Sequence, residues 1–162
     1  MTRLTNEYSQ EYPCIIVVPQ ADTEYGWYDD GVLECVLALV ENVQTQHNGD
    51  TSRLYVVGYS MGGYAAWRLL TDHPKKIAAA VPVSGRVSPN SAPLFKDVPI
   101  WVFHGAHDDV VGVVFSRNIV KTLREIGGNV EYTEFPDAGH DCCGRAFGSD
   151  ELVPWMFTQG KK

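Results

Sequence analysis

Residues 54–63 read Leu-Tyr-Val-Val-Gly-Tyr-Ser-Met-Gly-Gly, and this stretch decides the fold. Residues typical of a β-strand lead into Gly58-Tyr-Ser60-Met-Gly62, and the helix-forming run 64–70 follows at once. A serine flanked in this way, at a sharp turn from strand to helix, has the pattern of a nucleophile elbow. We expect strained backbone at Ser60, and we expect that a Cβ at Gly58 or Gly62 would collide with neighbouring elements.

A nucleophilic serine needs a general base within hydrogen-bonding distance. The chain has five histidines, which are His47, His73, His104, His107 and His140. His140 is the predicted base, because it lies in the turn-rich loop 136–141 after a strand-like run; a purely structural loop histidine is the alternative. Simpler roles suit the other four: a helix end for His47 and His73, a loop brace for His104, and a loop position for His107.

The base needs a carboxylate to orient it. Asp108 and Asp109 follow a strand-like run that ends at His104, and working groups gather at the carboxyl ends of parallel strands. Asp108 is the predicted acid and Asp109 the reserve, with a solvated loop carboxylate as the simpler interpretation of Asp109. Asp137 and Asp141 lie close to the predicted base in sequence and stay open as alternatives.

Strand-like and helix-like segments alternate along the chain. The predicted strands are Cys14–Val18, Leu54–Val57, Ala79–Val83, Ile100–Phe103 and Val130–Phe135. The predicted helices are Asp30–Gln46, Phe115–Ile126 and Asp150–Thr158, with Arg86–Phe95 as a loop. This alternation predicts an α/β fold: a mainly parallel sheet of about five strands flanked by helices, in a single domain over residues 1–162.

Composition narrows the function. Of 162 residues, 44% are hydrophobic and 20% are charged, which is ordinary for a globular domain, and the net charge of −7 argues against a nucleic-acid or anionic-membrane partner. No apolar run is long enough for a membrane span, and the polar start does not resemble a signal peptide, so we expect a cytoplasmic location unless a signal has been lost. Cys14 is expected to be buried in a strand. The pair Cys142-Cys143 lacks the spacing of a metal site, and we expect no metal and no cofactor.

Three motifs together resemble the small α/β-hydrolase esterases, which include the phospholipase/carboxylesterase group and feruloyl-esterase and polyhydroxybutyrate-depolymerase-like proteins. Residues 50–64 are similar to the nucleophile region of those enzymes. The run 104–111, His-Gly-Ala-His-Asp-Asp-Val-Val, resembles their H-G-x-x-D-x-x-V-P signature, which implies that Asp108 is the triad acid; Gly112 stands where proline is usual. The run 138–141, Ala-Gly-His-Asp, resembles their final G-H motif, which implies that His140 is the base.

The start of the chain departs from that family. Its members usually carry an earlier strand that ends in H-G-x-G, whose loop supplies a second oxyanion donor, and residues 1–13 hold no such motif. A gap inside the sheet would leave buried N–H and C=O groups unpaired. We therefore expect Cys14–Val18 to lie beside Leu54–Val57, which would bring Pro19–Ala21 to the mouth of the site as a substitute donor. The alternative is that a second chain fills the gap, which would make the protein a homodimer.

The resemblance implies a serine esterase without a cofactor. Ser60 would attack an acyl carbonyl, His140 would take the serine proton, and Asp108 would stabilise the imidazolium. The N–H of Met61 would bind the oxyanion. The expected substrates are short-chain or polymer-attached acyl esters, free or carried on a partner polymer, and the product of the first step is an acyl-enzyme.

Three residues are predicted to contact the substrate: Trp27, Tyr59 and Gln20. Trp27 follows the first strand-like run, and it could equally well cover the edge of the core. Two other functions remain open. One is a weakly active or inactive truncated hydrolase scaffold, and the other is a serine peptidase with the same triad.

Overall fold

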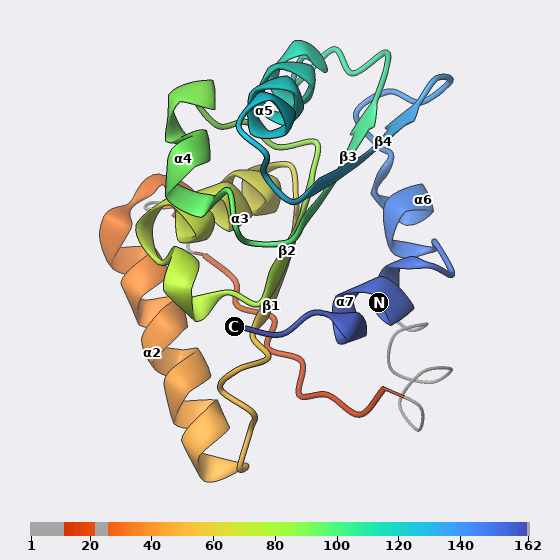
Figure 1. Cartoon of the computed structure of the whole chain (residues 1–162). Helices are drawn as coiled ribbons and strands as arrows, with labels where there is room; N and C mark the ends of the chain where they lie inside the picture. Colours follow the sequence, from red (N-terminus) through yellow and green to blue (C-terminus); the bar gives the residue numbers. More distant parts are fainter. Residues whose placement is uncertain (1–11, 22–25, 162) are drawn as a thin grey trace.

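The computed structural model describes residues 12–21 and 26–161, and in this part of the chain one sheet of four parallel strands forms the centre (Figure 1). The strands are β1 (Tyr55–Tyr59), β2 (Ala79–Val83), β3 (Ile100–Gly105) and β4 (Val130–Phe135), and they lie in the order β1-β2-β3-β4. The α/β class predicted from the sequence is confirmed, with four strands in the described sheet where about five were expected.

Helices cover both faces of the sheet (Figure 1). The α-helices are α2 (Asp30–Gln46), α3 (Met61–Asp72), α4 (Ala92–Phe95), α5 (Val114–Glu125), α6 (Cys143–Phe147) and α7 (Leu152–Thr158), and the 3₁₀ helices are η1 (Gly26–Tyr28), η2 (Pro74–Lys76) and η3 (Pro89–Ser91). The prediction of a loop over 86–95 is wrong, because η3 and α4 form there. Each of these two short helices carries a proline in its first turn, where no N–H is needed.

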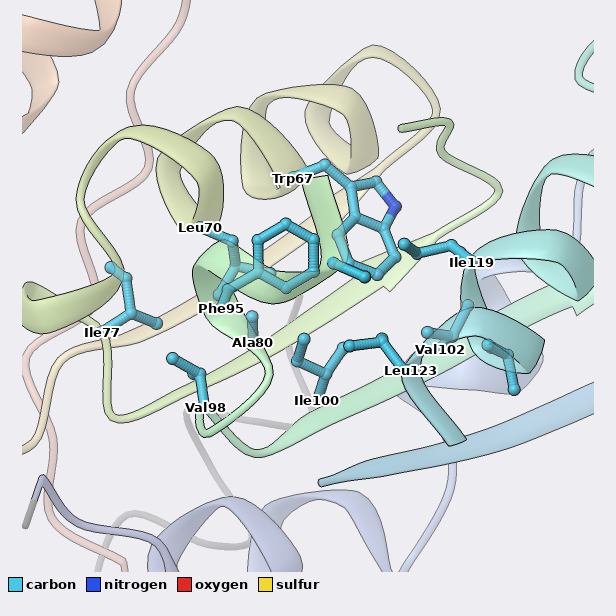
Figure 2. Close-up of a cluster of buried hydrophobic side chains, with 12 residues drawn as sticks. Trp67, Leu70, Ile77, Ala80, Phe95, Val98, Ile100, Val102, Ile119 and Leu123 are labelled. Atoms are coloured by element: carbon cyan, nitrogen blue, oxygen red, sulfur yellow. The ribbon is translucent and has the colours of Figure 1, made fainter. Parts of the chain in front are cut away.

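The core has two layers because alternate residues of a strand face opposite sides of the sheet. Ile100 and Val102 of β3 pack with α3, α4 and α5 in a cluster that includes Trp67 and Phe95 (Figure 2). Trp101 and Phe103 of β3 point the other way, into a second cluster built with α6 and α7. Helix α2 lies further out and packs on α3 through Leu33 and Leu37.

Parallel pairing aligns the carboxyl ends of the strands. Tyr59 at the end of β1 is opposite Val83 of β2, and Gly105 at the end of β3 is opposite Phe135 of β4. The loops that leave all four strands therefore begin at one edge of the sheet, and this edge holds the candidate site.

The predicted strand Cys14–Val18 is wrong. This segment has no regular secondary structure, and the side chains of Ile15, Ile16 and Val18 are 50%, 48% and 59% exposed. Cys14 is exposed as well, not buried. The expected pairing with Leu54–Val57 is therefore wrong, and β1 is an edge strand of the described sheet. A β-branched run favours a strand only where neighbours cover it, since β propensity mostly measures packing on a half-buried surface.

Within the same described residues, no helix combines the length and the apolar character needed to cross a lipid bilayer.

Candidate active site

Ser60 is the single residue between the end of β1 and the start of α3, and its backbone has φ 56° and ψ −114°. Its N–H donates to the carbonyl of Val83 on β2 at 2.9 Å, which ties the strained turn to the sheet. A Cβ at Gly58 would lie 2.0 Å from the carbonyl oxygen of Gly62, so this position accepts only glycine. The expected collision at Gly62 itself is wrong, because a Cβ there would meet nothing within 4 Å. The second close approach is at Gly63, where a Cβ would lie 2.6 Å from the Val83 oxygen.

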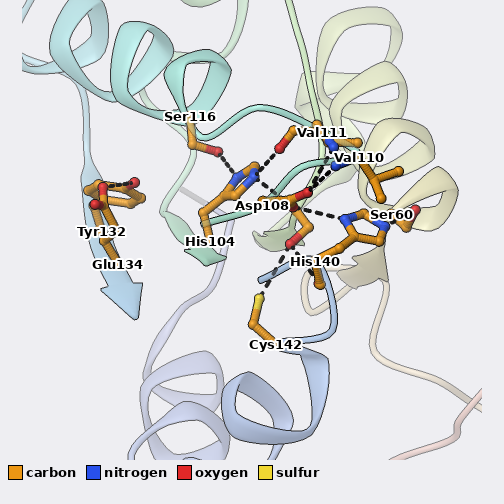
Figure 3. A network of polar contacts seen from close by, with 11 residues as sticks. Ser60, His104, Asp108, Val110, Val111, Ser116, Tyr132, Glu134, His140 and Cys142 are labelled. Carbon is orange, nitrogen blue, oxygen red and sulfur yellow. Dashed lines mark hydrogen bonds and ion pairs between the residues drawn. The ribbon is translucent and has the colours of Figure 1, made fainter. Parts of the chain in front are cut away.

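Three side chains from three loops form one hydrogen-bonded chain at the carboxyl edge of the sheet (Figure 3). His140 Nε2 lies 2.9 Å from Ser60 Oγ, and His140 Nδ1 lies 2.8 Å from Asp108 Oδ2. A carboxylate only accepts, so Nδ1–H donates to Asp108 and Nε2 can accept the serine hydroxyl proton. The structure thus brings together the serine, the histidine and the first-choice acid that the sequence singled out.

The carboxylate of Asp108 is buried and saturated with donors. Its Oδ1 accepts from the N–H groups of Val110 at 3.0 Å and Val111 at 2.8 Å, while Oδ2 accepts from His140. Burial raises the pKa of Asp108, but the hydrogen bonds from His140, Val111 and Val110 together outweigh it and hold that pKa below its ordinary value. Asp108 is therefore an anion that faces the imidazole.

The alternative acids lie elsewhere. Asp109 is exposed, and Asp137 pairs with Arg145 at 2.6 Å. Asp141 accepts from Cys143 Sγ at 3.5 Å. The carboxylate that contacts His140 is that of Asp108 instead.

The loops that carry Asp108 and His140 touch through their backbones. A Cβ at Gly105 would lie 2.1 Å from the carbonyl oxygen of Gly139, so the two loops approach more closely than any side chain allows. His107 N–H donates to the Ala138 carbonyl at 2.9 Å. This contact sets the distance between Asp108 and His140, and it assigns His107 a backbone role in the acid loop.

Ser84, at the end of β2, is a residue of the site that the sequence did not indicate. It is fully buried, and its φ is 47°, a conformation that residues other than glycine seldom adopt. Its Oγ lies 3.3 Å from Cys142 Sγ and 3.4 Å from the His140 carbonyl oxygen, so it secures the loop of the base. A Val-Ser-Gly run after an apolar strand is too common to have identified this role.

Met61 is the first residue of α3, and the amides of a helix's first turn have no carbonyl partner within that helix. Its N–H is thus placed next to Ser60 at the positive end of α3. The shift of Cys14–Val18 that was expected to carry Pro19–Ala21 to the same place does not occur. Asp22, the next residue of that expected donor loop, lies outside the described residues.

The predicted substrate contacts separate into two places. The Tyr59 ring lies 5.2 Å from the His140 ring, measured between centroids, so Tyr59 flanks His140. Gln20 and Trp27 line a different hollow of about 530 Å³ beside α2, and none of its lining residues belongs to the hydrogen-bonded chain of Ser60. Trp27 also packs against the cluster between α2 and α3, as a cover for the edge of the core.

No group of three or more His, Cys, Asp or Glu side chains is arranged to hold a metal ion in residues 12–21 and 26–161.

The model of the Phospholipase/Carboxylesterase family matches residues 31–150. A bifunctional acetylxylan esterase/xylanase, XynS20E of Neocallimastix patriciarum, is 29% identical over 114 residues, which are 68% of this chain and 17% of that protein. A putative carboxymethylenebutenolidase of Yersinia pestis is 26% identical over 65% of this chain and 41% of its own length.

The crystal structure of a thermostable esterase superposes with a TM-score of 0.93 at 32% identity, over 98% of this chain and 47% of that one. The chain thus spans less than half the length of each of these three relatives. The expected resemblance to small esterases is confirmed. Because the family match covers well over half of the residues, the chain belongs to the phospholipase/carboxylesterase family of α/β-hydrolases.

Proposed function

We propose that this chain hydrolyses carboxylic esters through an acyl-enzyme formed on Ser60. The observation that carries the proposal is the continuous chain from Ser60 Oγ through His140 to the buried anion of Asp108, with links of 2.9 and 2.8 Å. Membership of an esterase family supports the same chemistry.

The reaction needs two balanced steps. His140 Nε2 accepts the hydroxyl proton as Ser60 Oγ attacks the acyl carbon, and the imidazolium then gives that proton to the departing alcohol oxygen. Water next loses a proton to His140 and attacks the acyl-enzyme, which releases the acid and regenerates the serine. Asp108 stays ionised throughout, because it holds the imidazole tautomer and stabilises its charge.

The developing oxyanion faces the start of α3. We assign one donor to the Met61 N–H, because Ser60 precedes it directly and the first-turn amides are free of helix bonds. The positive end of α3 favours negative charge at this point.

The substrates that we propose are short-chain or polymer-attached acyl esters. Val110 beside the acid and Met61 beside the nucleophile are both strongly exposed, which fits an open apolar surface for a small acyl group and leaves room for a bulky alcohol part. An acetylxylan esterase among the relatives supports an ester on a polymer, although the name describes that protein.

The test compares esters with amides in one assay. We expect the purified chain to turn over p-nitrophenyl acetate and butyrate, and Ser60→Ala to abolish turnover, because triad members act as a unit. Faster turnover of aminoacyl-nitroanilides would instead indicate a peptidase. Turnover equal to that of Ser60→Ala on all substrates would indicate an inactive scaffold.

A further inference from the structure

His104, at the end of β3, is buried behind the acid and takes no part in the proton transfers proposed above. Its side chain has no exposed surface, and both ring nitrogens are engaged (Figure 3). Nε2 lies 2.8 Å from the Val111 carbonyl oxygen, and Nδ1 lies 2.7 Å from Ser116 Oγ. A carbonyl only accepts, so Nε2 carries a proton, while the serine hydroxyl can donate to Nδ1. A neutral imidazole in this tautomer satisfies every contact.

The same ring nitrogen is close to the reacting machinery. His104 Nε2 lies 3.1 Å from Asp108 Oδ2, the oxygen that accepts the His140 proton. The Val111 peptide links the two residues a second time, because its carbonyl accepts from His104 and its N–H donates to Asp108 Oδ1. The buried Nε2–H of His104 therefore makes two contacts. It holds the Val111 peptide, whose N–H binds Oδ1 of Asp108, and it lies beside Oδ2 of the same carboxylate.

We propose that His104 is a positioning residue for the triad acid: its Nε2–H fixes the Val111 peptide and thereby the rotation of the Asp108 carboxylate toward His140. This inference rests on the proposed function, since it concerns the same triad. The mechanism is geometric. The N–H groups of Val110 and Val111 hold Oδ1 of Asp108, and the His104 Nε2–H lies beside Oδ2. Without the hydrogen bond from His104 to the Val111 carbonyl, the loop 108–111 is free to turn Oδ2 away from the His140 imidazole.

A matched pair of variants separates this role from simple packing. His104→Gln keeps an N–H donor at about the reach of Nε2, while His104→Met has a similar length and volume and no donor. Rates are expressed per serine that reacts with a fluorophosphonate, so that unfolded protein does not count. We expect His104→Met to lower kcat by about 10- to 100-fold with little change in KM, by analogy with the loss when a hydrogen-bond partner that orients a metal ligand is removed. We expect His104→Gln to recover most of that loss.

A double-mutant cycle gives the second readout. If His104 acts through the carboxylate, His104→Met should cost far less in the Asp108→Asn background than in the wild type. Equal kcat losses in the Gln and Met variants, or losses that are additive with Asp108→Asn, would overturn the inference, and so would a His104→Met enzyme with wild-type kcat. If the wild-type chain itself fails to react at Ser60, the proposed function fails and this inference fails with it; if only the His104 variants behave otherwise than expected, the proposed function stands.

Discussion

Asp108, the proposed acid, and Ser60, the proposed nucleophile, follow two strands with different surroundings. β3 runs between β2 and β4 and all its residues are buried, so the loop with Asp108 begins at a fully enclosed strand. β1 pairs with β2 alone among the described strands, and Val57 at its centre is 42% exposed. Ser60 at the end of β1 is held by local backbone geometry, through the bond to Val83 and the fit of Gly58, not by enclosure. The candidate site therefore combines a buried carboxylate, that of Asp108, with a serine at the end of an edge strand.

The largest loss of activity should follow substitution of Asp108, in the loop after the buried strand β3. Asp108→Asn should lower kcat by roughly 10⁴-fold, because the amide favours the wrong tautomer of His140. Asp109→Asn, the matched control one residue along, should keep wild-type activity because its carboxylate is exposed. Steady-state kinetics on p-nitrophenyl acetate measures both, and an equal or larger loss at Asp109 would exchange their roles.

Substitutions of Gly58 and Gly62 should differ sharply in their effect on stability, although the two glycines lie symmetrically on either side of Ser60 in the sequence. Gly58→Ala forces a Cβ to within 2.0 Å of a backbone oxygen, so we expect loss of fluorophosphonate labelling and a large fall in thermal stability. Gly62→Ala places its Cβ in open space in the first turn of α3, so the fold should be kept, with a gain in stability of no more than the roughly 1 kcal/mol by which helix interiors favour alanine over glycine. A folded, labelled Gly58→Ala protein would show that the turn is less tightly determined than described.

An isoleucine pair compares the buried strand with the exposed segment directly. Ile100 on β3 is 1% exposed, and Ile16 in the segment before η1 is 48% exposed. Ile100→Ala should lower the free energy of unfolding by about 2–5 kcal/mol, whereas Ile16→Ala should change it by no more than about 0.5 kcal/mol. Denaturant unfolding gives both values. A large cost at Ile16 would mean that this segment is covered in solution.

The smallest predicted effect is the pH dependence of the stability that Glu134 of β4 contributes. Glu134 accepts from Arg117 at 2.9 and 2.6 Å and from the Tyr132 hydroxyl at 2.6 Å. The Arg117 hydrogen bonds lower the pKa of Glu134 most, burial opposes them and the Tyr132 bond adds to them, and the pKa falls from 4.5 to about 2. Because the folded pKa is depressed, this stabilisation is complete above pH 4.5 and is lost as the pH falls toward 2.

Glu134→Gln should therefore lower the melting temperature modestly at neutral pH and much less near pH 2. Thermal melts of both proteins between these limits give the difference. If the difference in melting temperature between the two proteins does not vary with pH, the ionised carboxylate of Glu134 is not its cause.

The contrast between buried strands and the exposed segment before η1 also explains which elements could be predicted from the sequence. The strands β1 to β4 were predicted to within about two residues, because most strands of parallel sheets are continuous apolar runs, although β4 carries two glutamates. Ser60, Asp108 and His140 could be expected to meet, since each follows such a strand at its carboxyl end. Cys14–Val18 has the same composition as those strands, and composition does not reveal whether a neighbour is present to pair with it.

Other parts of the site depend on contacts that leave little trace in the sequence. Ser84 contacts the loop of His140 through its Oγ from an unusual backbone conformation, and Gly105 is required by the backbone of a loop more than thirty residues away. Gln20 lies away from Ser60 because residues 12–21 do not form a strand beside β1, which their composition could not reveal. The assignment of catalytic roles to Ser60, Asp108 and His140 stays a prediction.

The most direct test of the central claim is covalent labelling of the folded chain with a fluorophosphonate, followed by peptide mass spectrometry. We predict one adduct, on Ser60, whose formation is slowed by Asp108→Asn and unaffected by Asp109→Asn. No adduct on the folded protein, or an adduct on another serine such as Ser84, would contradict the account.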